Sequence, residues 1–189
     1  SSDLSVFTDA SDIGIWAQDA VNAMAAAGYI HGSNGQFRPT AGITRAEIVT
    51  ILDNIFAGLC RSGGSYTDDV EGSLVVNSSD VSLEGMTIKG DLIIAEGVAA
   101  NSVVLDGVTV EGRIIVRGGG TGSNAVVITG DSVVGTVVVQ RQSETVEIEV
   151  QGNAQGNEIV ASSGTESMTV SGTVDTVTVD DANTAVEKI

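Results

Sequence analysis

The segment LDGVTVEGRIIV, residues 105–116, contains two sequence elements that recur through the second half of the chain. In the first element, an apolar residue and a variable residue precede a glycine, here Gly107. In the second, a glycine, here Gly112, precedes one variable residue and three apolar residues. Valine and isoleucine favour β-strands, and glycine commonly marks where a strand ends. The segment therefore predicts short strands separated by glycine corners.

Both elements repeat in phase along the chain. Steps of 22, 23, 22 and 20 residues separate the glycines of the first element: Gly85, Gly107, Gly130, Gly152 and Gly172. Steps of 18, 22 and 23 residues separate those of the second: Gly72, Gly90, Gly112 and Gly135. A period of this length is typical of proteins in which each repeat packs on the next.

We predict a parallel β-solenoid (β-helix) of about five rungs over residues 71–182, followed by a C-terminal tail at 183–189. Each unit would form one rung, and equivalent strands would stack in parallel about 4.8 Å apart. Glycine tolerates both the corner dihedral angles and the close approach of successive backbones. A Greek-key sandwich is the competing interpretation. It explains short strands, but not a repeat that stays in phase over four steps.

Residues 1–60 have a helical pattern instead. Apolar residues at three- and four-residue spacing predict a first helix that ends at Gly28. A second helix opens with a capping box, in which Thr44 caps the helix and Glu47 bonds back to it. Its apolar stripe is Ile48, Ile51, Leu52, Ile55, Phe56 and Leu59. Small polar residues then predict a linker at 61–70, so the chain is of the α+β class in two parts.

Five blocks of the helical part stand in the order and spacing of an S-layer homology (SLH) domain. The blocks are FTD at 7–9, WA at 16–17, GYIHG at 28–32, GQFRP at 35–39 and ITRAE at 43–47. Residues 7–59, a little under a third of the chain, therefore resemble the SLH family. The solenoid part more loosely resembles segments that accompany such modules in secreted proteins of Gram-positive and related bacteria.

The resemblance implies a module that holds secondary cell-wall polysaccharide, often a pyruvylated and therefore anionic sugar. It implies Arg45 as the cation that faces the ligand, with Trp16, Gly28 and Gly32 near the binding groove. Elementary chemistry agrees for Arg45, because a guanidinium binds a carboxylate through two parallel hydrogen bonds. A position in the first turn of a helix favours an anion as well.

Structural interpretations stand beside these roles. Capping accounts for Thr44 and Glu47 without any ligand. Trp16 lies on the apolar face of the first helix, so it is a candidate for core packing as well as for sugar contact. Arg45 is a candidate for a structural ion pair.

The number of modules departs from the family pattern. SLH modules usually come as three tandem copies that pack as a pseudo-trimer, and this chain contains one. If the binding groove forms between adjacent modules, a single module has no complete groove. Either several chains then bring their modules together, or the module binds another protein instead of the polysaccharide. The first alternative predicts a trimer or ring, and the second predicts a polymer.

Composition excludes several partners. The formal net charge of −17 and the pI of about 4.1 argue against nucleic acid, whose phosphates need clustered Lys and Arg. No apolar run is long enough to span a membrane.

The single cysteine, Cys60, cannot form an intrachain disulfide and is expected to be an idle thiol. The start at Ser1-Ser2-Asp3 has the form of a processed secretory product.

Catalytic and metal motifs are not found. His31, the only histidine, lacks the partners that a zinc site or a catalytic triad needs. Arg113 and Arg117 with Asp91 and Asp106 could form a cluster of the kind that polysaccharide-degrading solenoids use, but surface charge accounts for them. No cofactor is expected. Asp68-Asp69 and Asp180-Asp181 are possible calcium-binding pairs, but neither pair has an EF-hand spacing.

We therefore expect a non-catalytic structural protein at the bacterial cell surface, in the wall or an S-layer. The SLH module would attach to wall polysaccharide or to a neighbouring subunit, and the solenoid would self-assemble into a layer or filament. The alternatives are a wall-anchored adhesin that binds carbohydrate and an enzyme that acts on polysaccharide.

Overall fold

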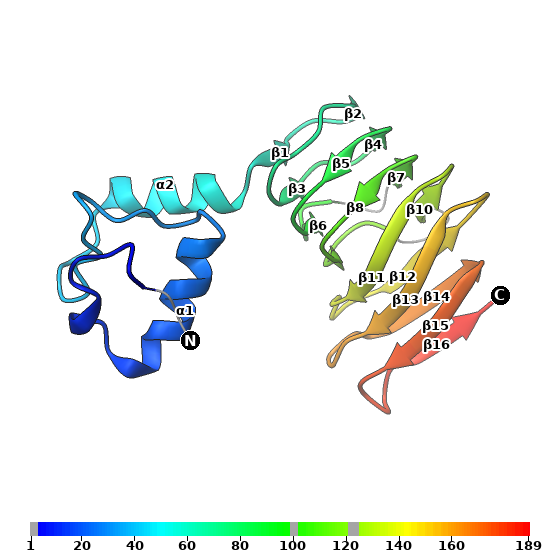
Figure 1. Ribbon diagram of the computed structural model, residues 1–189. Helices are drawn as coiled ribbons and strands as arrows, with labels where there is room; N and C mark the ends of the chain where they lie inside the picture. Colours follow the sequence, from blue (N-terminus) through cyan, green and yellow to red (C-terminus); the bar gives the residue numbers. More distant parts are fainter. Residues whose placement is uncertain (1–3, 99–101, 121–124) are drawn as a thin grey trace. The chain divides into compact units, whose positions relative to one another are not determined.

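The computed structural model describes residues 4–98, 102–120 and 125–189, and it divides the chain into two compact units (Figure 1). The first unit ends at Phe56 and the second runs from Ala57 to Ile189. The Ser1-Ser2-Asp3 start lies outside the described residues.

The first unit is a small helical module. Its helices are the 3₁₀ turn η1 (Ala10–Asp12), α1 (Ile15–Ala26) and α2 (Arg45–Ile55). Four buried side chains form its core: Leu4, Phe7, Ile13 and Val21. The ring of Phe37 packs against that of Phe7, with centroids 5.6 Å apart, and so attaches the loop between the helices to this core.

The end of α1 is determined by Gly28. Its φ of +73° is a left-handed conformation that L side chains rarely adopt. The Gly28 amide donates to the carbonyl of Ala25, and the Tyr29 amide donates to that of Met24. These two bonds make a Schellman motif, which terminates the helix and turns the chain into the loop.

The second unit is a parallel β-solenoid of two stacked sheets, as predicted (Figure 1). One stack is ordered β1 (Gly58–Cys60), β3 (Leu74–Val76), β6 (Leu92–Ile94), β9 (Ile114–Val116), β11 (Val133–Val139), β13 (Gln155–Ala161) and β15 (Val174–Val179). The short strands β5 (Thr87–Ile88) and β8 (Thr109–Val110) join it at one corner. The other stack is ordered β2 (Gly64–Tyr66), β4 (Val81–Glu84), β7 (Val103–Asp106), β10 (Val126–Thr129), β12 (Thr145–Val150), β14 (Ser167–Gly172) and β16 (Ala185–Lys188).

Strand pairing distinguishes this fold from the sandwich. Every pairing described within the second unit is parallel, and each joins residues about one repeat apart, such as Leu83 with Leu105 and Ile128 with Val150. A Greek key would instead pair neighbouring strands antiparallel. The glycine-marked repeats coincide with β4, β7, β10, β12 and β14, which gives the expected solenoid of about five turns.

The solenoid extends beyond the predicted range at both ends. Strands β1 and β2 pair with β3 and β4, so they occupy part of the segment expected as a linker, 61–70, and the end of the expected module. Strand β16 pairs with β14 within the expected tail, 183–189. These terminal strands lack the full repeat. They still join the stack, because backbone pairing and one or two apolar contacts suffice to add a strand to it.

The interior of the solenoid is built from aliphatic side chains that alternate along each strand. In β7 and β10, for example, residues 103 and 105 and residues 126 and 128 are buried, while their neighbours are not. Equivalent positions on successive turns stack inward: Leu83, Leu105, Ile128, Val150. Such a narrow interior suits β-branched residues and leucine, which explains the scarcity of aromatics.

Candidate functional site

The loop between α1 and α2 is attached by one carboxylate. Asp9 accepts hydrogen bonds from the backbone amides of Phe37 and Arg38, at 2.8 and 2.7 Å. These bonds, with Phe37 the larger cause, lower the pKa of the Asp9 carboxyl. Arg38 has a φ of +57°, so the two bonds also stabilise a backbone conformation that is uncommon for a side chain of this size.

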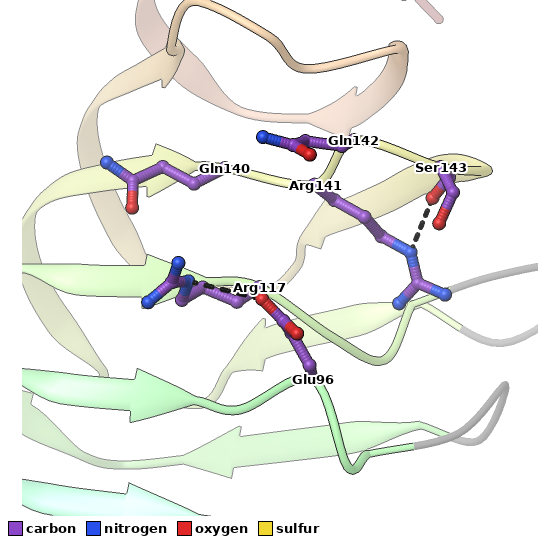
Figure 2. A pocket seen from close by; sticks show the side chains of 6 residues that line it. All are labelled: Glu96, Arg117, Gln140, Arg141, Gln142 and Ser143. Carbon is purple, nitrogen blue, oxygen red and sulfur yellow. Dashed lines mark hydrogen bonds and ion pairs between the residues drawn. The ribbon is translucent and has the colours of Figure 1, made fainter.

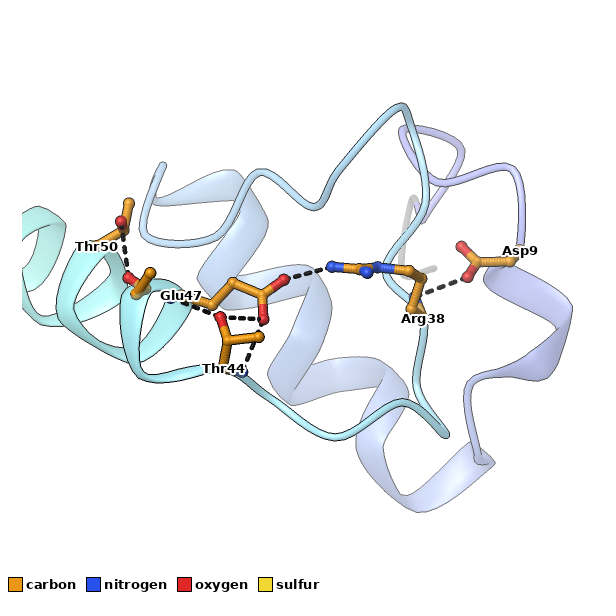
Figure 3. Close-up of polar contacts among 6 residues, drawn as sticks. Asp9, Arg38, Thr44, Glu47 and Thr50 are labelled. Atoms are coloured by element: carbon orange, nitrogen blue, oxygen red, sulfur yellow. Dashed lines mark hydrogen bonds and ion pairs between the residues drawn. The ribbon is translucent and has the colours of Figure 1, made fainter.

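Helix α2 begins with the capping box that the sequence indicated. The Glu47 amide donates to the Thr44 hydroxyl at 3.2 Å, and the Glu47 carboxylate accepts from the Thr44 amide at 2.8 Å (Figure 3). The same carboxylate forms an ion pair with the guanidinium of Arg38. The Thr44 amide is the largest cause of a lowered Glu47 pKa, and Arg38 adds to it.

Asp9, Arg38 and Glu47 thus form a connected polar chain across the module (Figure 3). The sequence pattern assigned no role to Asp9 or Arg38. No periodicity links these positions, because their contacts depend on how the loop folds back. The only signal was that each residue falls inside a quoted block, FTD or GQFRP.

A pocket of about 480 Å³ lies between this loop and α2. Its walls include Tyr29, His31, Gly32, Arg38 and Glu47. Of the residues predicted to bind wall polymer, Gly32 lines this pocket, whereas Arg45, Trp16 and Gly28 do not. His31 is exposed at the rim and forms none of the described hydrogen bonds or ion pairs.

Gly32 is required by its surroundings. A Cβ there would lie 2.4 Å from the carbonyl oxygen of Gln36 and 2.9 Å from the ring of Phe7, and φ is +66°. Gly28, by contrast, has open space around it and is needed for its φ. Both glycines therefore have structural reasons to be present.

Trp16 does not pack in the core. Its side chain is 91% exposed, and the indole lies over Gly14 beyond the start of α1. A helical side chain covers the turn N-terminal to its own Cα, and at the second helical residue that turn is already outside the helix. The core-packing interpretation is therefore wrong, and the indole face is open to solvent.

Arg45 is the first residue of α2, and its side chain is exposed. The Arg45 side chain makes no hydrogen bond and no ion pair with any described residue, so a structural ion pair is not formed in the described part of the chain. Arg38 makes the ion pair of this region instead, and Arg45 remains available for an external anion.

The apolar stripe of α2 is only partly covered. Ile51 and Ile55 are half-buried, whereas Ile48, Val49 and Leu52 are 42%, 64% and 47% exposed. Positions 45, 49 and 52 follow one another at spacings of four and three, so Arg45 shares this exposed face. The single module therefore presents a cation beside an unpartnered apolar surface.

The charged residues of the solenoid that were candidates for a catalytic or calcium site do not come together. Arg113 pairs with Asp91 at 3.0 Å, and Arg117 lies 3.7 Å from Glu96, so the two arginines stand at opposite ends of β9. Asp69 accepts the Thr87 amide, and Asp181 accepts from Asn183. In the described part of the chain, no three His, Cys, Asp or Glu side chains are grouped to hold a metal.

The described helices have at most 12 residues, and none is long and apolar enough to cross a membrane.

Comparison with known proteins agrees with the geometry of the first unit. Residues 6–49 match the family model of the S-layer homology domain. Searches of curated proteins and of solved structures find no match to the chain. S-layer homology domains are non-catalytic modules that bind cell-wall polysaccharide and associate proteins with the cell surface. This chain thus contains an S-layer homology domain at residues 6–49, followed by a parallel β-solenoid of about five turns.

Proposed function

We propose that this protein is a secreted, non-catalytic structural component of the bacterial cell surface, anchored through Arg45 and Trp16. The observation that carries the proposal is the state of Arg45, an exposed guanidinium at a helix N-terminus with no partner in the described structure. The charge and the helix dipole favour a carboxylate at that place. The exposed indole of Trp16 offers an apolar face for a sugar ring.

Binding to purified cell-wall sacculi tests this anchor. We expect the wild-type protein to sediment with sacculi, and Arg45→Ala to lose most of that binding, since a charged hydrogen-bonded contact contributes roughly 1.5–3 kcal/mol. Trp16→Ala should weaken binding too. Arg61→Ala, which removes an exposed arginine outside the SLH domain, is the matched control. Equal binding of Arg45→Ala and Arg61→Ala would refute the role of Arg45.

We further propose that modules of several chains associate through the exposed face of α2. Ile48, Val49 and Leu52 form an apolar surface that the small core of the module does not cover. Such surfaces on a small domain commonly mark contacts with another protein. A second copy of the module is the partner that would carry the same surface and complete a groove near Arg45.

The solenoid supports the structural part of the proposal. Its stacked strands form a stiff unit, and the ends of such a stack favour further parallel pairing, which leads to filaments or layers rather than closed dimers. Negative-stain microscopy of the purified protein should show fibres or sheets. Val49→Lys should separate the parts of these assemblies that α2 holds together, whereas Ile15→Lys, at an 88% exposed position on α1, should leave them intact. Isolated particles of wild-type protein would argue against assembly.

An enzyme that acts on polysaccharide is the alternative to a non-catalytic role. A glycosidase needs a general acid whose pKa is raised. Among the described residues, the carboxyl groups whose pKa is shifted are Asp9, Glu47 and Glu84. In all three the pKa is lowered, which is opposite to the shift of a general acid. Release of reducing or unsaturated sugar from a polysaccharide panel would overturn this part of the proposal.

A further inference from the structure

A second pocket lies on the solenoid. Its volume is about 570 Å³, within the range of roughly 300–1,000 Å³ that is typical of small-ligand sites. Six residues line it: Glu96, Arg117, Gln140, Arg141, Gln142 and Ser143. All six are polar or charged, so an apolar ligand is excluded.

The pocket is built by the repeat itself. Ile94, Val116 and Val139 occupy equivalent positions in β6, β9 and β11. Arg117 and Gln140, each directly after such a strand, therefore stand on successive turns (Figure 2). Glu96, which follows β6, stands one turn before Arg117. At about 4.8 Å per turn, polar groups are presented over roughly 10 Å, which suits an extended ligand rather than a small ion.

The turns that carry the lining residues are closely packed. A Cβ on Gly118 would lie 2.1 Å from the carbonyl oxygen of Ala95, so only glycine lets the turn carrying Arg117 approach the turn carrying Glu96 this closely. Arg141 is fixed as well. Its guanidinium donates to the backbone carbonyls of Ser143 at 2.7 Å and Gly119 at 3.3 Å, and it pairs with Glu144. Its side chain is only 13% exposed.

Arg117 differs from Arg141 in having free donors. Its one described polar contact is Glu96 at 3.7 Å, longer than a hydrogen bond, and its side chain is 52% exposed. The side chains of Gln140 and Gln142 are exposed and make no hydrogen bond among the described residues, so their side-chain amides are free to donate and accept. One available guanidinium beside two amides is a donor set for a carboxylate flanked by hydroxyl groups.

We propose that this pocket binds a carboxylate-bearing saccharide, such as a segment of uronic acid polymer. Arg117 takes the carboxylate, and Gln140 and Gln142 bond to ring hydroxyls. Arg141 shapes the wall without contacting the ligand. The net charge of −17 does not prevent this, because distant charges are screened beyond about 8 Å at physiological ionic strength. The solenoid would then hold a glycan independently of the SLH domain.

Titration of the full chain with a uronic acid oligosaccharide tests the proposal, with a neutral glucose oligosaccharide of equal length as comparison. Binding is measured by calorimetry and by NMR of the Gln side-chain amides. We expect the uronate to shift the amide signals of Gln140 and Gln142. Arg117→Gln should lower the affinity for the uronate roughly tenfold or more, since a charged hydrogen bond is lost.

Three further variants sharpen the outcome. Arg113→Gln, at the other end of β9, is the matched control and should bind normally. Gln140→Glu should reduce binding through repulsion. Arg45→Ala should leave these amide shifts intact, so failure of the anchor and failure of this site are distinguishable. Absence of uronate binding, equal affinity for the neutral oligosaccharide, or an unchanged affinity of Arg117→Gln would each overturn the proposal.

Discussion

Single glycines of the repeat have different physical reasons to be glycine. Gly107 adopts a φ of +65°, and the same left-handed conformation recurs at Gly85, Gly130 and Gly152. Gly112 has no positive φ, but a Cβ there would lie 2.5 Å from the carbonyl oxygen of Gly90. The first set is required by the dihedral angle of a corner, and Gly112 by the approach of two turns.

Alanine substitutions should separate these two causes. Gly107→Ala should cost about 1–2 kcal/mol, the strain of a left-handed L residue. Gly112→Ala should cost more, because the strand ladder has to move apart. Gly135→Ala is the matched control, since a Cβ there meets its nearest neighbour at 3.9 Å. Urea unfolding of the solenoid, followed by circular dichroism, measures all three. A large loss at Gly135 would contradict this explanation.

Cys60 is fully buried at the end of β1 and is a free thiol. Burial raises its pKa to about 11 from an ordinary value of 9.0, because the thiolate is poorly solvated there. Because the pKa of Cys60 is higher in the folded protein than in the unfolded chain, the buried thiol stabilises the fold. This stabilisation is complete below the pKa of the unfolded chain and is lost as the pH rises toward 11.

We therefore expect native Cys60 to react slowly with thiol reagents at neutral pH and quickly after denaturation. The unfolding free energy of the wild type should fall between about pH 9 and pH 11, and that of Cys60→Ala should fall less over the same range. Thiolate absorbance and urea unfolding at several pH values measure this. Rapid labelling of the folded protein would contradict the burial.

Among the elements, the loop between the helices depends most on charge. Asp9 and Glu47 both have a lower pKa in the folded protein than in the unfolded chain. Their carboxylates therefore stabilise the fold above the pKa of the unfolded chain, and this stabilisation is lost as the pH falls through the pKa of the folded protein. The SLH module should therefore lose thermal stability below about pH 4.

Asp9→Asn should lower the melting temperature of the module near pH 7 and should show a smaller further loss on acidification than the wild type. The carboxamide keeps the shape, but it has one acceptor oxygen. Phe37 and Arg38 donate to different oxygens of Asp9, so one of these two hydrogen bonds is lost. Asp19→Asn, on the exposed surface of α1, serves as control and should follow the wild type. Helical circular dichroism against temperature at both pH values is the measurement.

At the scale of the whole molecule, the chain consists of two units with separate cores. Leu105 lies in the middle of the solenoid core and is fully buried. Leu105→Ala should remove about 2–5 kcal/mol from the stability of the solenoid.

The two units should therefore respond separately. In calorimetry, Leu105→Ala should shift only the transition of the solenoid, and Asp9→Asn only that of the module. Shifts of both transitions by either variant would show that the units unfold together.

The sequence alone determined the features that depend on local spacing. The in-phase glycines predicted the solenoid and its five turns, and Thr44 with Glu47 predicted the start of α2, because these patterns join residues that lie close in the chain or repeat at a fixed period. Tertiary structure decided the rest. It left Trp16 exposed, paired Arg38 with Glu47, and left the Arg45 side chain without a partner among the described residues. It also extended the stacks to β1 and β16. It also brought Glu96, Arg117 and Gln140 into one pocket. Those outcomes depend on loop conformation, on register between turns and on how far a small core reaches, and no short-range pattern encodes them.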